Sequence, residues 1–209
     1  MRFDVNVGVQ AQNDMRARPA GAQAGADAEH PAASVTSHGT IVCDVVGVSA
    51  GNLLVDVTED AGERSSATKR VAVQSDGGLM YLPNQGTLNE EEAELASLLA
   101  PGLLGTDRAV GDSWTFRLSS PNYSATKTFR LTQIVSQERV SLSFDESFTR
   151  TGAEAATGTV TGTVVYDPAG LVPLDAKIDR LTRSEDAGTY TSRKLALDFT
   201  LEEDTRAKH

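Results

Sequence analysis

The chain has 209 residues, a formal net charge of −10 and only 5% aromatic residues. An acidic surface repels nucleic acid phosphates and anionic lipid headgroups, so we expect neither as a partner. No stretch approaches 18 consecutive apolar residues, so we expect no membrane span. Cys43 is the only cysteine, which excludes an internal disulfide and a cysteine-based zinc cluster. We expect one β-rich domain over residues 1–209, with no cofactor and no bound metal.

The first third of the chain predicts antiparallel strands. "RFDVNVGVQ" alternates apolar and polar residues, which is typical of a half-buried strand. The Ala-, Gly- and Pro-rich stretch at about 14–34 predicts a mobile loop. Residues 40–60, "TIVCDVVGVSAGNLLVDVTED", predict a hairpin with its turn at "SAGN", and residues 69–83 predict another around Asp-Gly.

The pattern changes at "LNEEEAELASLLAPGLLG" (88–105). Asn89 and Glu92 have the spacing of a capping box, and acidic residues fill the first turn, where the helix dipole favours them. Leucines follow at helical spacing, and Pro101 with Gly102 ends the pattern. We expect one amphipathic helix at about 89–100, packed on the apolar face of the sheet.

Strands resume after this helix in "DSWTFRL", "TFRLTQIV", "VSLSF", "TVTGTVVYDPAGLVPLDAKID" and "RKLALDFTLEED". Their alternation favours antiparallel strands with one wet face over a parallel sheet buried on both sides. The predicted fold class is therefore all-β, mainly antiparallel, as a curved sheet or half-barrel with one packed helix. The side chains expected on its apolar, ligand-facing surface are Leu95, Leu98, Leu99, Trp114, Phe116, Phe129, Leu142 and Phe144.

The tetrapeptide SATK occurs twice, with Ser66 and Lys69 in one copy and Ser124 and Lys127 in the other. Ser-x-x-Lys is the acylation signature of penicillin-binding proteins and serine β-lactamases, in which the lysine lies one helical turn after the serine. Here both copies run into alternating apolar residues, and positions three apart on a strand point to opposite faces. We interpret them as polar lead-ins to strands. A weak strand–turn–strand repeat with a period near 90 residues also suggests duplication, but it does not place the two copies at equivalent points.

No catalytic set converges elsewhere in the sequence. Ser113 in "GDSWT" precedes a strand and lacks the second glycine of a nucleophile elbow, and His38 is expected on the surface, facing away from Cys43. His30 lies in the Ala/Gly/Pro-rich stretch, and His209 is the last residue. The acidic residues at the ends of alternating segments are interpreted as solvated strand ends rather than a calcium site: Asp56, Glu59, Asp60, Asp145 and Glu146.

The alternating strands and the Leu-rich helical segment together resemble the half-barrel lipoprotein and lipid carriers of bacteria, of the LolA/LppX type. The resemblance is architectural, covers about residues 34–203 and contains no diagnostic motif. It implies a curved antiparallel sheet whose hollow is plugged by helices and holds a lipid. The chain departs from those carriers by showing no export signal, no lipidated cysteine and only one helix. An uncharacterised bacterial envelope protein of similar architecture is the other resemblance.

From this we expect non-enzymatic binding of a lipid or other apolar ligand in a half-barrel. The alternative is a structural or protein-interaction domain with a filled core, whose partner is another protein. An enzymatic function is the least favoured of the three hypotheses. Location stays open: cytoplasmic for the chain as given, or the cell envelope if an export signal lies upstream of Met1.

Overall fold

The structure is a computed structural model, and it describes residues 1–14, 33–60, 67–100, 108–136, 139–153, 155–169, 172–186 and 189–204. In these ranges the chain forms strands and one short helix, as the sequence predicts. The elements in chain order are β1 (Arg2–Asp14), β2 (Ala33–Ser49), β3 (Asn52–Asp60), β4 (Lys69–Val73), β5 (Leu79–Tyr81), α1 (Glu90–Ser97), β6 (Ser113–Ser120), β7 (Tyr123–Ser136), β8 (Arg139–Arg150), β9 (Ala156–Asp167), β10 (Val172–Asp186) and β11 (Thr189–Glu203).

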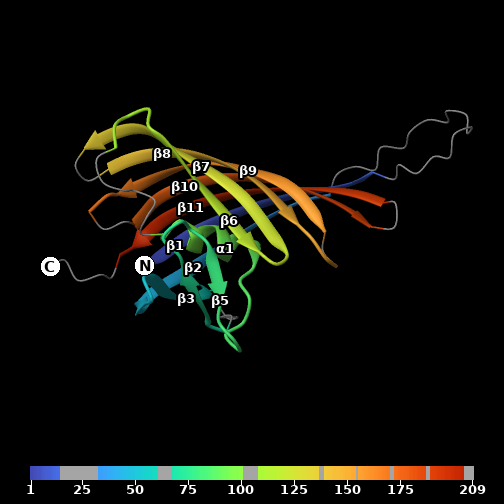
Figure 1. The fold of residues 1–209 in the computed structure, drawn as a ribbon, viewed down its shortest axis with the longest axis horizontal. Coiled ribbons are helices and arrows are strands. Elements are labelled where there is room, and N and C mark those ends of the chain that lie inside the picture. Colours follow the sequence, from blue (N-terminus) through green and yellow to red (C-terminus); the bar gives the residue numbers. More distant parts are fainter. Residues whose placement is uncertain are drawn as a thin grey trace, which may run out of the picture.

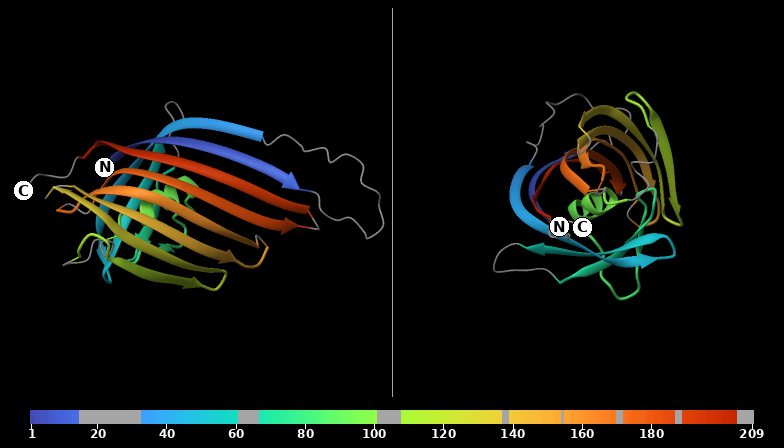
Figure 2. Two further views of the ribbon diagram at one scale, coloured as in Figure 1. Left: turned by 90° about the horizontal axis from the view of Figure 1, so that it is seen from above. Right: turned by 90° about the vertical axis from the view of Figure 1, so that its left-hand side faces the viewer.

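All eleven of these strands belong to one antiparallel sheet, in the order β5-β4-β3-β2-β1-β11-β10-β9-β8-β7-β6. The first and last strands are neighbours at its centre, where Val5 lies opposite Phe199. Strands β5 and β6 are the two edges. The sheet curves strongly and wraps around α1, which lies in its hollow (Figure 1 and Figure 2). The expected all-β, mainly antiparallel curved sheet with one packed helix is confirmed.

Tight turns set the register of the first hairpins. Between β2 and β3, Ala50 (φ 51°) and Gly51 (φ 82°) both adopt positive φ. Two such residues in succession match the twist of the flanking strands, which is the usual geometry of a two-residue hairpin. Ser49 accordingly pairs with Asn52, as the "SAGN" turn predicts. The turn before β5 uses Gly77 at φ 87°, next to Asp76.

Helix α1 begins with the predicted capping box. The Asn89 side chain accepts a hydrogen bond from the backbone N–H of Glu92, and the Glu92 carboxylate accepts one from the backbone N–H of Asn89 (2.8 and 2.7 Å). The helix ends at Ser97, short of the expected limit near residue 100. Leu95 and Leu98 are fully buried against the sheet. Burial of a leucine side chain contributes roughly 1.5–3 kcal/mol, so the two leucines anchor the helix firmly in the hollow.

Two glycines in β9 make room for aromatic rings on the inner face. Gly158 lies opposite Phe148, and Gly162 lies opposite Phe144. A Cβ atom at either glycine would come within 2.5 Å of the ring facing it. Aromatic rings that cover cross-strand glycines help to fix register in a curved sheet. The rings of β8 can therefore lie flat across β9 beneath the hollow.

Several element boundaries differ from the sequence prediction. Strand β7 begins at Tyr123 and β8 continues to Arg150, so the second SATK copy lies within a strand instead of leading into one. In the first copy, Lys69 opens β4, whereas Ser66 lies outside the described residues. The loop predicted at about 14–34 also lies mostly outside them, and both of its ends belong to strands. The segments β2–β4 and β7–β9 each form a simple meander, an arrangement that consecutive hairpins adopt without duplication. The internal repeat therefore stays a prediction.

Candidate ligand-binding pocket

An open pocket of about 820 Å³ lies where the two edges of the sheet approach each other. One wall comes from the β4–β5 hairpin and the other from β6, β7 and β8, with α1 between them. The edges come close at Gly78, whose added Cβ would lie 3.3 Å from a methyl carbon of Leu118. Apolar side chains contribute to the lining, namely Leu79, Leu88, Ala93 and Leu118.

One face of α1 forms part of this pocket. Glu90, Ala93, Glu94 and Ser97 all line it, and their spacing of three and four residues places them on one side of a helix. The opposite side carries Leu95, which is buried in the core. One side of α1 thus packs against the core, and the other side contributes polar side chains to the pocket lining.

A row of side chains on the sheet faces this helix. Lys127 of β7 is the direct partner of Glu146 of β8, Glu146 is the partner of Val160 of β9, and Val160 is the partner of Arg180 of β10. Each of these side chains is less than a tenth exposed. Two cations and one carboxylate therefore lie in one row on the inner face, with Val160 between Glu146 and Arg180, in a position that sheets normally fill with apolar residues.

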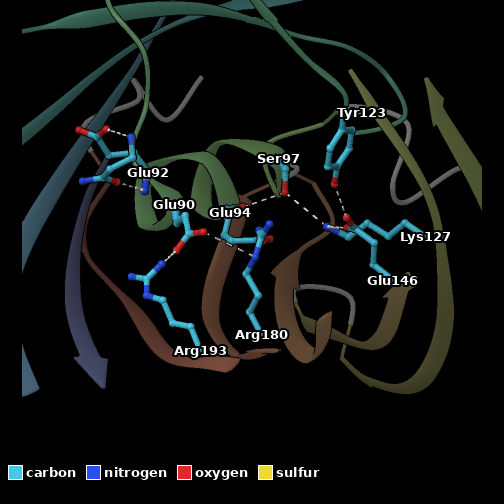
Figure 3. A network of polar contacts seen from close by, with 10 residues as sticks. Glu90, Glu92, Glu94, Ser97, Tyr123, Lys127, Glu146, Arg180 and Arg193 are labelled. Atoms are coloured by element: carbon cyan, nitrogen blue, oxygen red, sulfur yellow. Dashed lines mark hydrogen bonds and ion pairs between the residues drawn. The ribbon is translucent and has the colours of Figure 1, made fainter. Parts of the chain in front are cut away.

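Arg180 connects the row to the helix. Its Nη1 donates a hydrogen bond of 2.7 Å to Oε1 of Glu94, and its Nε lies 4.0 Å from Oε1 of Glu90 (Figure 3). Glu90 also pairs with Arg193 of β11. The Arg180 guanidinium lies over the ring of Phe148, 4.4 Å from its centroid. No hydrogen-bond partner for the buried Nε of Arg180 exists among the described residues.

Lys127 has looser contacts than Arg180. Its Nζ lies 3.4 Å from Oε2 of Glu146 and 3.5 Å from Oγ of Ser97, whereas the hydroxyl of Tyr123 donates a hydrogen bond of 2.7 Å to Oε1 of Glu146. Charge-assisted hydrogen bonds from an ammonium are normally about 2.7–2.9 Å. The Lys127 ammonium is therefore buried without a short hydrogen bond, at 4.7 Å from the ring centroid of Phe144.

Burial shifts the proton equilibria of this network. It raises the pKa of Glu94 despite the opposing charges of Lys127 and Arg180, and the charge of Glu146 adds to the increase. Burial and the Glu146 carboxylate likewise raise the pKa of Tyr123, so its hydroxyl stays protonated and can donate. Arg180 stays charged: burial opposes its charge, but Glu94 and Glu90 hold its pKa above the usual value.

The two SATK lysines contact opposite ends of α1. Lys69 forms hydrogen bonds of 2.9 and 2.6 Å with both carboxylate oxygens of Glu92, in the first turn, and Lys127 approaches Ser97 in the last turn. Ser124 is exposed whereas Lys127 is buried, so the serine and lysine of this copy lie on opposite faces. Both lysines therefore contact the helix, and in the second copy the serine does not face its lysine.

The apolar residues predicted for the ligand-facing surface belong to the core instead of lining this pocket. Leu95, Leu98, Leu99, Phe129, Leu142 and Phe144 are buried in one cluster, and Trp114 and Phe116 pack against it from β6. They pack tightly, since the ring centroids of Trp114 and Phe129 lie 5.9 Å apart.

The interpretation of Glu146 as a solvated strand end was wrong. It lies within β8 and is 6% exposed, because β8 continues beyond Phe144 and keeps Glu146 on the inner face. Asp145, in contrast, is exposed, and Asp56 pairs with Arg70 through two hydrogen bonds. Glu59 and Asp60 end β3, where Asp60 accepts a hydrogen bond from Arg2.

The remaining candidates that the structure describes, His38, Cys43 and Ser113, have separate surroundings. His38 is exposed and contacts Asp4 at 2.7 Å, whereas Cys43 is fully buried, and burial raises the pKa of its thiol to about 12. Ser113 opens β6 on the exposed side. His30 and His209 lie outside the described residues.

The sequence does contain a signal for this pocket. In β7, Lys127 shares the inward register with Ala125 and Phe129; in β8, Glu146 shares it with Phe144 and Phe148. In β10, Arg180 follows Ala176 and Ile178 at the same spacing of two. A charged residue in the inward register of an amphipathic strand is buried, and buried charges need a partner or a ligand. Applied strand by strand, this rule predicts all three residues.

A second depression of about 470 Å³ lies over β1, β2, β9, β10 and β11. Two of its lining residues, Gly8 and Ala196, are direct cross-strand partners with small side chains. Its rim includes the exposed residues Gln10 and Lys194. Arg180 lines this depression as well as the larger pocket, whereas Lys127 and Glu146 line only the larger pocket.

Comparison with known proteins adds little. No family model matches the chain, and no curated protein matches it. Among solved structures, an alignment with Ail, the attachment invasion locus protein of Yersinia pestis, covers 95% of this chain and 97% of that one, at 8% identity and a TM-score of 0.21. A similarity this low supports no argument about fold or function.

Two features are absent from the described residues. No helix there has the length and apolar character needed to cross a membrane. In the same ranges, no group of three or more His, Cys, Asp or Glu side chains is arranged to hold a metal ion.

Proposed function

We propose that this protein binds a small amphipathic molecule, a lipid or a similar compound with a polar end, in the pocket between the two edges of the half-barrel. The binding is carrier-like and involves no chemical change in the ligand. The observation that carries the proposal is the pocket itself. It is open, has a volume of about 820 Å³, and combines apolar walls with buried charged side chains.

The pocket has the general properties of a small-molecule site. Ligand sites are typically clefts of about 300–1,000 Å³, with mainly apolar walls and a few placed polar groups. Leu79, Leu88 and Leu118 supply apolar wall, whereas Lys127 and Arg180 supply the polar groups. Their location inside a curved sheet also agrees with the architectural resemblance to half-barrel lipid carriers.

The alternative is a structural or protein-interaction domain. The observation in its favour is the packed core, because Leu95 and Leu98 are fully buried where a hollow carrier would hold its ligand. On this alternative the pocket is an incidental gap between two sheet edges, and an edge strand such as β6 would pair with a partner protein.

Native mass spectrometry of the purified protein, compared with its denatured mass, tests the proposal. An adduct that disappears on denaturation and extracts into organic solvent supports carrier function and gives the ligand class. For the protein stripped of any such adduct, titration with the fluorescent probe ANS measures whether the pocket accepts an amphiphile. We expect saturable binding with one site per chain.

A pair of variants makes the test specific to the pocket. Ala93→Trp places a bulky side chain on the pocket wall of α1, and Thr115→Trp places the same side chain on the exposed side of β6, away from the lining. Ala93→Trp should abolish saturable binding, and Thr115→Trp should leave it unchanged. Equal binding by both variants, with melting temperatures near that of the parent protein, would favour the structural alternative.

A further inference from the structure

We propose that the polar end of the ligand is a carboxylate, bound by the Lys127 ammonium and the Arg180 guanidinium. This inference rests on the proposed function, because it names the chemistry of the ligand that the pocket would take. It follows from two cations that are buried beside the pocket and only partly satisfied by protein acceptors: Nε of Arg180 has none among the described residues, and the contacts of Lys127 are long.

Arg180 provides the first of these donors. The side chain is 8% exposed and lines the pocket, and its one hydrogen bond within the described residues goes from Nη1 to Glu94. Nε has no acceptor there, and the nearest carboxylate oxygen, on Glu90, is 4.0 Å away. Leaving a buried charged donor without an acceptor is unfavourable, so a ligand oxygen that reaches this guanidinium gains a strong interaction.

Lys127 provides the second donor independently, from another strand. It is 3% exposed, yet its two oxygen contacts measure 3.4 and 3.5 Å. An ammonium can donate three hydrogen bonds, and shorter contacts are usual for a buried one. Lys127 and Arg180 lie in one row across three strand spacings, about 14 Å of sheet. The sheet curves around α1, and Figure 3 shows both side chains reaching toward this helix, Arg180 at Glu94 and Lys127 at Ser97.

The charged side chains that line the pocket are balanced in number, with Asp76, Glu90, Glu94 and Glu146 against Arg117, Lys127, Arg150 and Arg180. A ligand with a single negative charge disturbs this balance less than a ligand with several charges.

An apolar tail completes the ligand, since Leu79, Leu88 and Leu118 line the same pocket. A simple fatty acid therefore fits better than a phosphate ester or a nucleotide, which carry more charge. The overall charge of −10 opposes anions at long range. That repulsion is screened beyond about 8–10 Å at ordinary salt, so it limits the number of ligand charges more than it excludes a single one.

A series of ligands that differ only at the polar end tests the inference on the unmodified protein. The probes are dodecanoic acid, its methyl ester, dodecanol and dodecylamine, each measured by displacement of ANS. We expect the acid to bind about tenfold to hundredfold more tightly than the ester or the alcohol, the range for a hydrogen bond to a charged group. The amine should bind most weakly. Equal binding of acid and alcohol, or preference for the amine, would overturn the carboxylate inference alone. Failure of all four probes to bind would overturn the proposed function as well.

Variants of Lys127 then test whether this residue causes the preference for the acid over the alcohol. Lys127→Met should remove most of the acid's advantage over the alcohol without weakening the alcohol, and Lys127→Arg should keep it. The control is Lys177→Met, which removes a lysine of β10 that is 69% exposed and outside the pocket. If Lys127→Met retains the full preference for the acid, the assignment to Lys127 is wrong. The ligand series on the parent protein decides the inference even if a variant fails to fold.

Discussion

Replacing Gly158 by alanine tests how the curved sheet supports the pocket. An added Cβ would lie 2.3 Å from the carbonyl oxygen of Leu181 and 2.5 Å from Cζ of Phe148. Real Cβ atoms do not approach other atoms so closely, so the backbone of β10 or the ring must move. Overpacking of this kind costs about 1–3 kcal/mol. For a chain of this size each kcal/mol corresponds to about 2–4 °C, so we expect the melting temperature to fall by about 2–12 °C.

The matched control is Gly8→Ala, also in a strand but in open surroundings. Its Cβ would meet only Ala196, at 3.8 Å, which is an ordinary contact. There the lower entropy of the unfolded chain should stabilise the protein by about 0.4–1 kcal/mol. Thermal melts followed by circular dichroism, with urea unfolding as a second measure, compare the two variants. If Gly158→Ala melts at or above the temperature of Gly8→Ala, the close approach of β9 to the Phe148 ring is not a property of the folded protein.

Gly158→Ala should also disturb the pocket. The ring of Phe148 stacks on Tyr123, with centroids 6.0 Å apart, and lies beneath the Arg180 guanidinium. Moving the ring shifts both polar groups, so the preference of the binding site for an acid over an alcohol should decrease. Gly8→Ala should leave that preference intact.

Three further predictions concern α1. Asn89→Ala removes the side-chain half of the capping box and should lower the free energy of unfolding by about 1 kcal/mol in urea, with Asn89→Ser close to the parent. Lys69→Met leaves the fully buried Glu92 without its cation and should cost about 3–5 kcal/mol by the same assay, whereas a loss below 1 kcal/mol would show that Glu92 is solvated. Burial raises the pKa of Glu94 above 4.5, so its stabilising contribution is complete below the unfolded pKa and is lost as pH rises through the folded one. Urea midpoints from about pH 4 to about pH 8 should therefore contain a falling component that Glu94→Gln removes.

The fold could largely be predicted from the sequence because its signals are local. Alternation in "KLALDFTLEE" (194–203) places Leu195, Leu197 and Phe199 inside, as the structure does. The capping box needs only Asn89 and Glu92, three residues apart. The order of the strands in the sheet, in contrast, could not be predicted from local signals. The pairing of β1 with β11 joins residues almost 200 positions apart, and no local pattern specifies that contact.

The pocket was not predicted from the sequence, because its charged residues have the same composition as solvent-exposed segments. The first turn of α1 has the composition of a solvated helix start. Glu92 and Glu94 are nevertheless buried, because Lys69 of β4 and Arg180 of β10 pair with them. Glu146 follows directly after Asp145, so the two form one acidic pair in sequence although they point to opposite faces of β8. Composition alone does not separate the two residues, whereas the inward register does.

Replacing residues of the buried polar row tests whether these residues serve ligand binding or the stability of the fold. Replacing a buried ion pair by apolar residues is often neutral or stabilising, whereas removing one partner typically costs about 3–5 kcal/mol. If Tyr123, Lys127 and Glu146 are kept for binding, they should therefore be dispensable for stability when all three are replaced together. The triple variant Tyr123→Phe, Lys127→Met, Glu146→Leu should unfold in urea at or above the parent midpoint, and Lys127→Met alone should unfold well below it.

The binding readout completes this comparison. The triple variant should still bind dodecanol, because the apolar walls remain, but should no longer prefer dodecanoic acid. Circular dichroism provides the control that the strands are intact. If the triple variant is as unstable as Lys127→Met alone, the row contributes directly to folding, and the packed-core alternative explains its burial better than a bound carboxylate does.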